Sequence, residues 1–235
     1  FVADHLAKHL IGGGDGFKEL VQFHPAYSYE DFVQGIRPKS RDDGKLEYFL
    51  APGRFLNFCK KAKSCKDICV MIIDEINRAN LSRVFGELMY LFEYRGDEIP
   101  LAADEKLFGI PRNVRIIGTM NTADRSIALV DHALRRRFAF LQLQPEYDTL
   151  RLYHERKGTI FPIEGLIQVL KSLNEDIRDP HYQVGISYFM NEDLGAQIED
   201  VWKMEIEPYL EEYFFHDKEK IKNYKWDAIQ GRINP

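Results

Sequence analysis

Four short apolar segments lie along the first part of the chain, and each is bounded by charged or turn-forming residues. They are Leu20–Phe23, Val70–Ile73, Val114–Ile117 and Phe138–Leu143. Apolar runs of this length, two of them nearly continuous, are typical of strands that are covered on both faces of a parallel sheet. We therefore predict four β-strands in this region.

Helical spacing fills the intervals between these segments. Apolar residues recur three and four positions apart from Leu81 to Phe92, and Asn80 stands where it could cap the start of that helix. Strands that alternate with helices predict an α/β fold, a parallel sheet flanked by helices.

The pattern changes after Pro145. Apolar residues at helical spacing predict one amphipathic helix over Ile163–Ile177 and suggest a second over Val201–Tyr213. We expect an α/β core domain over residues 1–145 and a helical domain over residues 146–235.

Composition excludes several classes of protein. The chain has 235 residues, of which 45% are hydrophobic and 29% charged, so it can bury a core and is not intrinsically disordered. No apolar stretch approaches the roughly 18 to 20 residues that cross a bilayer. The net charge of −5 argues against a chain that coats nucleic acid by charge alone. Three cysteines without zinc-ligand spacing favour a reduced, cytoplasmic compartment.

Two acidic residues follow the second apolar segment directly. Asp74 and Glu75 would lie at the carboxyl edge of the predicted sheet, where ligands bind in parallel α/β folds. Acids at that position could hold a phosphate-bound Mg²⁺ and polarise an attacking water. The pattern alone is equally typical of solvated acids that end a strand.

Polar residues also follow the third segment. Asn121 comes just after the expected strand end, where an amide could hydrogen-bond both a γ-phosphate and the water. By itself the pattern is also typical of a turn stabilised by Asn and Asp side chains.

Three consecutive arginines, Arg135, Arg136 and Arg137, end a short predicted helix before the fourth segment. Guanidinium groups could bind a phosphate or a carboxylate across an interface. The helix dipole would account for one cation at this position, but less readily for three.

Together these residues resemble the AAA+ nucleotide hydrolases, specifically the GTPase subunit of McrBC-type modification-dependent restriction systems. The resemblance covers about residues 20 to 143 and continues weakly through the helical part. The matching strings are Phe23–Phe32, Gly35–Pro38, Asp74–Asn80, Met120–Ser126 and Ala133–Phe138, which occur in the family's order.

The resemblance implies roles for the candidate residues. Asp74 and Glu75 would be the Walker B pair, with Asp74 binding Mg²⁺, and Asn121 would be the sensor amide. One of Arg135, Arg136 and Arg137 would be the arginine finger that reaches the nucleotide of a neighbouring subunit.

Further positions match the family less specifically. Asp124, Arg125 and Arg78 stand at positions near the nucleotide, where they would order the site or contact the adjacent protomer. Gln183–Met190 is similar to the second-sensor region of the helical lid, although Ile186 stands where family members often carry His.

One family motif is absent from the sequence. No Gly-x-x-x-x-Gly-Lys-Ser/Thr phosphate loop occurs, and Gly12–Gly16 is not followed by Lys-Ser/Thr. In this family the loop and its strand precede a helix like residues 1–10, and that strand would lie between the strands that end at Thr119 and Leu143. We therefore expect the chain to be part of a larger subunit and not to bind nucleotide tightly by itself.

The resemblance implies a homo-oligomeric ring, expected to be a hexamer, that hydrolyses GTP with Mg²⁺ and drives DNA translocation and cleavage by a McrC-like nuclease partner. ATP stays open as the nucleotide, because no Asn-Lys-x-Asp guanine-reading motif is present. Two other hypotheses also remain open. One is a MoxR-like or dynein-related ATPase that remodels protein complexes, and the other is a non-catalytic scaffold. A nuclease within the chain itself is disfavoured because nuclease motifs are absent.

Overall fold

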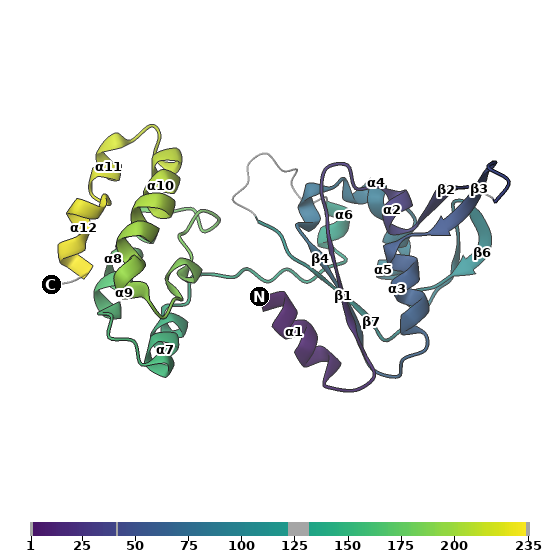
Figure 1. Ribbon diagram of the computed structural model, residues 1–235, viewed down its shortest axis with the longest axis horizontal. Coiled ribbons are helices and arrows are strands. Elements are labelled where there is room, and N and C mark those ends of the chain that lie inside the picture. Colours follow the sequence, from purple (N-terminus) through teal and green to yellow (C-terminus); the bar gives the residue numbers. More distant parts are fainter. Residues whose placement is uncertain (1, 41, 122–131, 234–235) are drawn as a thin grey trace. The chain divides into compact units, whose positions relative to one another are not determined.

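The computed structural model describes residues 2–40, 42–121 and 132–233. The chain divides into two compact units, Phe1–Phe140 and Leu141–Pro235 (Figure 1). The first unit combines strands and helices, and the second is helical.

The first unit contains a parallel sheet of three strands. These are β1 (Lys18–Gln22), β4 (Cys69–Asp74) and β7 (Val114–Gly118), in the order β1-β4-β7. Strand β4 is therefore central and pairs in parallel with both neighbours. The structure confirms the first three predicted strands and the parallel α/β sheet.

Helices cover both faces of β4, which explains its nearly continuous apolar sequence. On one face, Ala7 of α1 (Val2–Ile11) packs with Val70 and Ile72. On the other face, Met71 and Ile73 join a core of buried phenylalanines. The fully buried aromatic side chains of this core are those of Phe23, Phe32, Phe55, Phe58 and Phe85.

The prediction of a strand at Phe138–Leu143 was wrong. After α6 (His132–Arg135) the chain runs on without regular structure to residue 146. Phe140, Leu141 and Leu143 are 46%, 81% and 71% exposed. A strand requires a neighbour to satisfy its backbone hydrogen bonds, and no strand of the described residues pairs with this segment.

The predicted helix Leu81–Phe92 is broken into α4 (Leu81–Phe85) and α5 (Leu88–Glu93). Gly86 ends α4 with a φ of +49°, and a Cβ added there would lie 3.1 Å from the ring of Tyr29. The backbone therefore turns where only glycine fits easily. The predicted cap is confirmed, since Asn80 Oδ1 accepts a hydrogen bond from Arg83 N at 3.1 Å.

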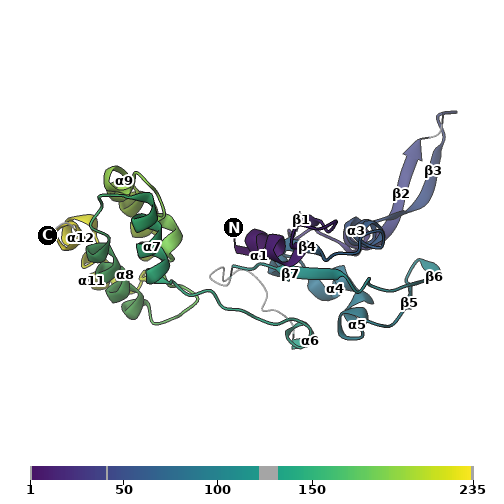
Figure 2. The same ribbon diagram turned by 90° about the horizontal axis from the view of Figure 1, so that it is seen from below.

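Two antiparallel hairpins that the hydrophobic pattern did not predict complete the first unit. One joins β2 (Gln34–Ser40) to β3 (Leu46–Pro52), between α2 (Tyr29–Phe32) and α3 (Arg54–Ala62). The other joins β5 (Ile99–Leu101) to β6 (Asp104–Phe108). Figure 2 shows the β2–β3 hairpin extending away from α3 and the sheet.

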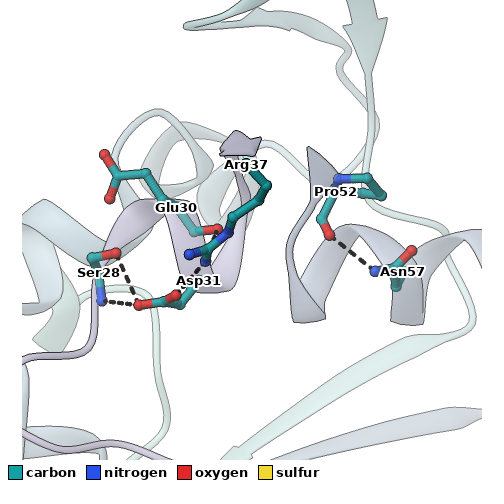
Figure 3. A network of polar contacts seen from close by, with 6 residues as sticks. All are labelled: Ser28, Glu30, Asp31, Arg37, Pro52 and Asn57. Atoms are coloured by element: carbon teal, nitrogen blue, oxygen red, sulfur yellow. Dashed lines mark hydrogen bonds and ion pairs between the residues drawn. The ribbon is translucent and has the colours of Figure 1, made fainter. Parts of the chain in front are cut away.

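Polar contacts attach the β2–β3 hairpin at its base (Figure 3). Asp31 accepts hydrogen bonds from Ser28 N at 3.3 Å and Ser28 Oγ at 3.0 Å, and it forms an ion pair with Arg37 of β2. The Arg37 guanidinium is the main cause that lowers the pKa of Asp31. At the other strand, Asn57 Nδ2 donates to Pro52 O at 3.0 Å. Both strands are thus tied to the helices beside them.

The second unit consists of helices around a separate core. They are α7 (Tyr147–Lys157), α8 (Ile163–Ile177), the 3₁₀-helix η2 (Ile186–Phe189), α9 (Leu194–Val201), the π-helix η3 (Trp202–Ile206), α10 (Glu207–Tyr213), α11 (Lys218–Lys222) and α12 (Trp226–Ile233). Helix α8 has the predicted bounds. The predicted helix Val201–Tyr213 is the later part of a longer run, α9-η3-α10.

Two buried polar side chains organise the helical core. Asn174 Oδ1 accepts from Val184 N at 2.7 Å, and its Nδ2 donates to Val184 O at 3.1 Å. His154 Nε2 lies 2.9 Å from Phe189 O, and because a carbonyl only accepts, this nitrogen carries the proton. These contacts fix the chain on both sides of Ile186.

No helix among the described residues has the length and apolar character that crossing a bilayer demands.

The hairpin attachment generates a test. Replacing Asp31 by Asn removes the charge that holds Arg37, so amide hydrogen exchange in residues 34–40 and 46–52 should accelerate several-fold. The control is Asp42→Asn, at an exposed acid near the hairpin tip, which should leave these exchange rates unchanged. The native contact is fully present above the pKa of Asp31 in the unfolded chain and is lost as pH falls through its lowered folded-state pKa. Equal exchange rates in both variants would contradict this attachment.

Candidate functional site

The carboxyl edge of the sheet brings the ends of β4 and β7 together. Thr119 follows β7 directly, and its Oγ1 donates a hydrogen bond to Asp74 Oδ1 at the end of β4. Thr119 N also donates to Ile73 O, and Ile76 N donates to Thr119 O, both at 2.9 Å. The half-buried Asp74 carboxylate is therefore held in place by the neighbouring strand.

Glu75 turns the chain sharply away from β4. Its φ of +53° lies in the left-handed region, which is unfavourable for a residue with a Cβ. A short 3₁₀-helix, η1 (Ile76–Arg78), follows. Within this turn Arg78 Nε lies 3.1 Å from Glu75 Oε2, so Arg78, expected near the nucleotide, contacts the second acid directly.

Asn121 lies two residues beyond Thr119, at the same edge. Its backbone carbonyl accepts a hydrogen bond from Asn77 Nδ2 at 3.3 Å. The structure thus brings Asp74, Glu75 and Asn121 to one edge of the sheet. Asn77 was missed by the sequence reasoning, although it stands within the matching string Asp74–Asn80.

The three arginines differ in their surroundings. Arg137 Nε donates to Met89 O at 2.7 Å, and its guanidinium pairs with Glu93 of α5 at 2.7 Å. Its side chain is only 13% exposed. Arg135 and Arg136 are exposed, and the guanidinium carbon of Arg135 lies 6.0 Å from the Phe140 ring centroid. Arg137 therefore serves the packing of its own unit.

Two further predicted site residues, Asp124 and Arg125, lie outside the described residues.

The predicted second-sensor region belongs to the helical unit. An open groove of about 760 Å³ lies beside η2 and is lined in part by Tyr188, Glu192, Asp193 and Glu205. The three carboxylates at this groove would repel a phosphate, and Ile186 is not among the residues that line it. This groove by itself is not a phosphate site.

The acidic edge of the sheet suits one type of metal ion. Among the described residues, no group of three or more His, Cys, Asp or Glu side chains could enclose a metal. Mg²⁺, however, is usually bound through one or two carboxylates, with phosphates and water as the other ligands. The Asp74 carboxylate, fixed by Thr119, fits that requirement.

Comparison with protein families agrees with the division into two units. Residues 1–138 match the AAA domain of the dynein-related subfamily. Residues 165–222 match the α-helical lid domain of McrB.

Individual relatives point the same way. Over 250 aligned residues the chain is 43% identical to the type IV methyl-directed restriction enzyme EcoKMcrB subunit of Escherichia coli K12, covering 96% of this chain and 53% of the relative. It is 29% identical over 164 residues to the type II restriction enzyme BsuMI component YdiS of Bacillus subtilis, covering 54% of this chain and 48% of that protein. The chain thus spans about half the length of these relatives.

Among solved structures, a putative ATPase from Cytophaga hutchinsonii aligns with a TM-score of 0.38 and 12% identity, over 97% of this chain and 80% of that one.

One assignment follows from three observations: the parallel sheet with its acidic carboxyl edge, the family match over residues 1–138 and the lid match over residues 165–222. The chain belongs to the AAA family, in its dynein-related subfamily, and is a McrB-like AAA+ subunit.

Proposed function

We propose that this chain carries the hydrolytic edge of a nucleoside-triphosphate-driven restriction motor. In the complete subunit it hydrolyses GTP and thereby drives DNA translocation and cleavage by a partner nuclease. The observation that supports the proposal is that Asp74 and Glu75 follow β4 at the same edge of the sheet where Thr119 and Asn121 follow β7. The relatives named as restriction enzyme components support the biological setting.

The chemistry follows from the residue types. Asp74 would hold Mg²⁺, which when bound neutralises charge on the phosphates. Glu75 would accept a hydrogen bond from the attacking water and orient it. The amide of Asn121 would donate to the γ-phosphate or to that water. Arg78, paired with Glu75, would keep the Glu75 carboxylate in one orientation.

The negative charge on the transferred phosphoryl group would be stabilised by a cation that a neighbouring subunit supplies when the subunits assemble. Arg135 and Arg136 are exposed at the end of α6 and could reach a neighbouring copy, whereas Arg137 is tied to α5. We therefore propose Arg135 or Arg136 as the arginine finger. Activity would then depend on a ring of identical subunits, for which we propose six copies, and on a McrC-like nuclease partner.

ATP is the second candidate nucleotide. The match to the dynein-related subfamily favours it, whereas the 43% identity to a McrB subunit favours GTP. A comparison of kcat/KM for the two nucleotides, measured on the complete protein with its partner, would decide between them.

The role of Glu75 is tested by replacing it with Gln in the complete protein. The amide has the same size but cannot accept the proton, so kcat should fall by roughly 10²- to 10⁴-fold while assembly is retained. Glu155→Gln, at an exposed acid of α7, is the matched control and should leave kcat unchanged. Full turnover by Glu75→Gln would contradict a catalytic role for this edge of the sheet.

The arginines generate a separate prediction. Of the two variants Arg135→Ala and Arg136→Ala, one should lower kcat by roughly 10³-fold. Neither should reduce the stability of the protein. Arg137→Ala should instead destabilise the first unit by about 2 kcal/mol, because a largely buried hydrogen bond and ion pair are lost. Chemical denaturation and steady-state turnover separate the two effects.

A mixing experiment tests whether the finger acts between subunits. Glu75→Gln subunits mixed with subunits of the inactive arginine variant should regain part of the turnover, because some interfaces then combine an intact Glu75 with an intact arginine. No recovery in mixed assemblies would contradict a finger supplied by the neighbour.

A further inference from the structure

One residue at the acidic edge has no role in the chemistry described so far. Asn77, in the middle of η1, is only 9% exposed. Its Nδ2 donates to the backbone carbonyl of Asn121 at 3.3 Å. Its Oδ1 is buried and has no hydrogen-bond partner among the described residues.

The local backbone explains why Asn77 points inward. The left-handed conformation of Glu75 reverses the chain, and the single 3₁₀ turn that follows buries Asn77 while Arg78 stays on the outside. Ile76 N donates to Thr119 O at 2.9 Å, so two successive residues of η1 contact the chain that follows β7. The turn that carries Glu75 and the segment that carries Asn121 are joined at these two points.

The unpaired oxygen distinguishes Asn77 from an ordinary structural amide. Asn174 in the helical core pairs both ends of its amide with Val184. A buried acceptor without a donor is unfavourable and is uncommon in folded proteins. The same amide contacts the backbone of Asn121 through its Nδ2, and Asn77 follows Glu75 by two residues in the chain.

We propose that Asn77 is a positioning residue for the hydrolysis: it fixes the backbone of Asn121 so that the side-chain amide of Asn121 is set relative to the Glu75 carboxylate. This inference rests on the proposed function of the same edge. Asn77 acts through Asn121 and need not touch nucleotide. Its loss should therefore reduce the rate of the chemical step more than nucleotide binding.

The test uses Asn77→Leu in the complete protein assembled with its partner. Leucine has nearly the shape of asparagine but cannot donate to the Asn121 carbonyl. We expect kcat to fall at least about 10-fold while KM for the nucleotide changes less than about threefold. If this variant does not assemble, Asn77→Asp, which keeps the side-chain shape but replaces the amide donor by a carboxylate that only accepts when ionised, takes its place with the same expectation.

The same substitution at Asn113 is the matched control. Asn113 Nδ2 donates to the carbonyls of Ala62, Cys65 and Asp67 at 2.9, 3.1 and 3.1 Å, and it lies at the opposite end of β7. Asn113→Leu should lower the unfolding temperature and leave kcat unchanged where the protein is folded. A merely structural Asn77 would behave in the same way.

A double variant tests whether Asn77 acts through Asn121. If it does, Asn77→Leu should lower kcat little further once Asn121→Ala has removed the sensor amide, so the double variant should lie within about twofold of Asn121→Ala alone. If the losses in kcat of the two single variants multiply in the double variant, the inference is wrong. It is also wrong if the kcat of Asn77→Leu lies within twofold of that of the unsubstituted protein. An inactive Glu75→Gln beside a fully active Asn77→Leu would refute this inference alone, whereas an active Glu75→Gln would refute the proposed function.

Discussion

The hydrogen bond from the Thr119 hydroxyl to the Asp74 carboxylate is the contact on which the candidate site depends. It joins the ends of two parallel strands, and the backbone bonds from Thr119 to Ile73 and from Ile76 to Thr119 fix the register beside it. Polar side chains that are far apart in sequence therefore reach one edge in a defined order. Without these contacts between the ends of β4 and β7, the positions of Glu75 and Asn121 relative to each other would not be fixed.

The central position of β4 determines where that edge begins. Because β4 lies between β1 and β7 and is covered on both faces, its apolar residues are almost fully buried up to Ile73. The transition from buried strand to polar edge occurs within one residue, at Asp74. The strained backbone of Glu75 is tolerated because the packed strand before it and the contacts of η1 after it determine its conformation.

The sequence predicted features that depend on local pattern and missed those that depend on partners. The strands containing Val70 and Val114 were predictable because burial on both faces leaves an apolar run. Phe138–Leu143 has a similar pattern, but a strand also needs a neighbour to bond with, which apolarity does not encode. The break at Gly86 depends on its approach to Tyr29, and the two hairpins have largely exposed, mixed sequences. Likewise, only tertiary contacts distinguish the largely buried Arg137 from the exposed Arg135 and Arg136. The hydrogen bond from Asn77 to Asn121 also depends on tertiary structure.

We propose that nucleotide is hydrolysed at the carboxyl edge of β4 and β7. The most direct measurement is an experimental structure of the complete assembly with Mg²⁺ and a non-hydrolysable GTP analogue. We expect a metal beside the Asp74 carboxylate and the Asn121 amide within hydrogen-bond distance of the γ-phosphate or its adjoining water. Nucleotide bound away from this edge, with Asp74 and Asn121 both remote from the phosphates, would contradict it.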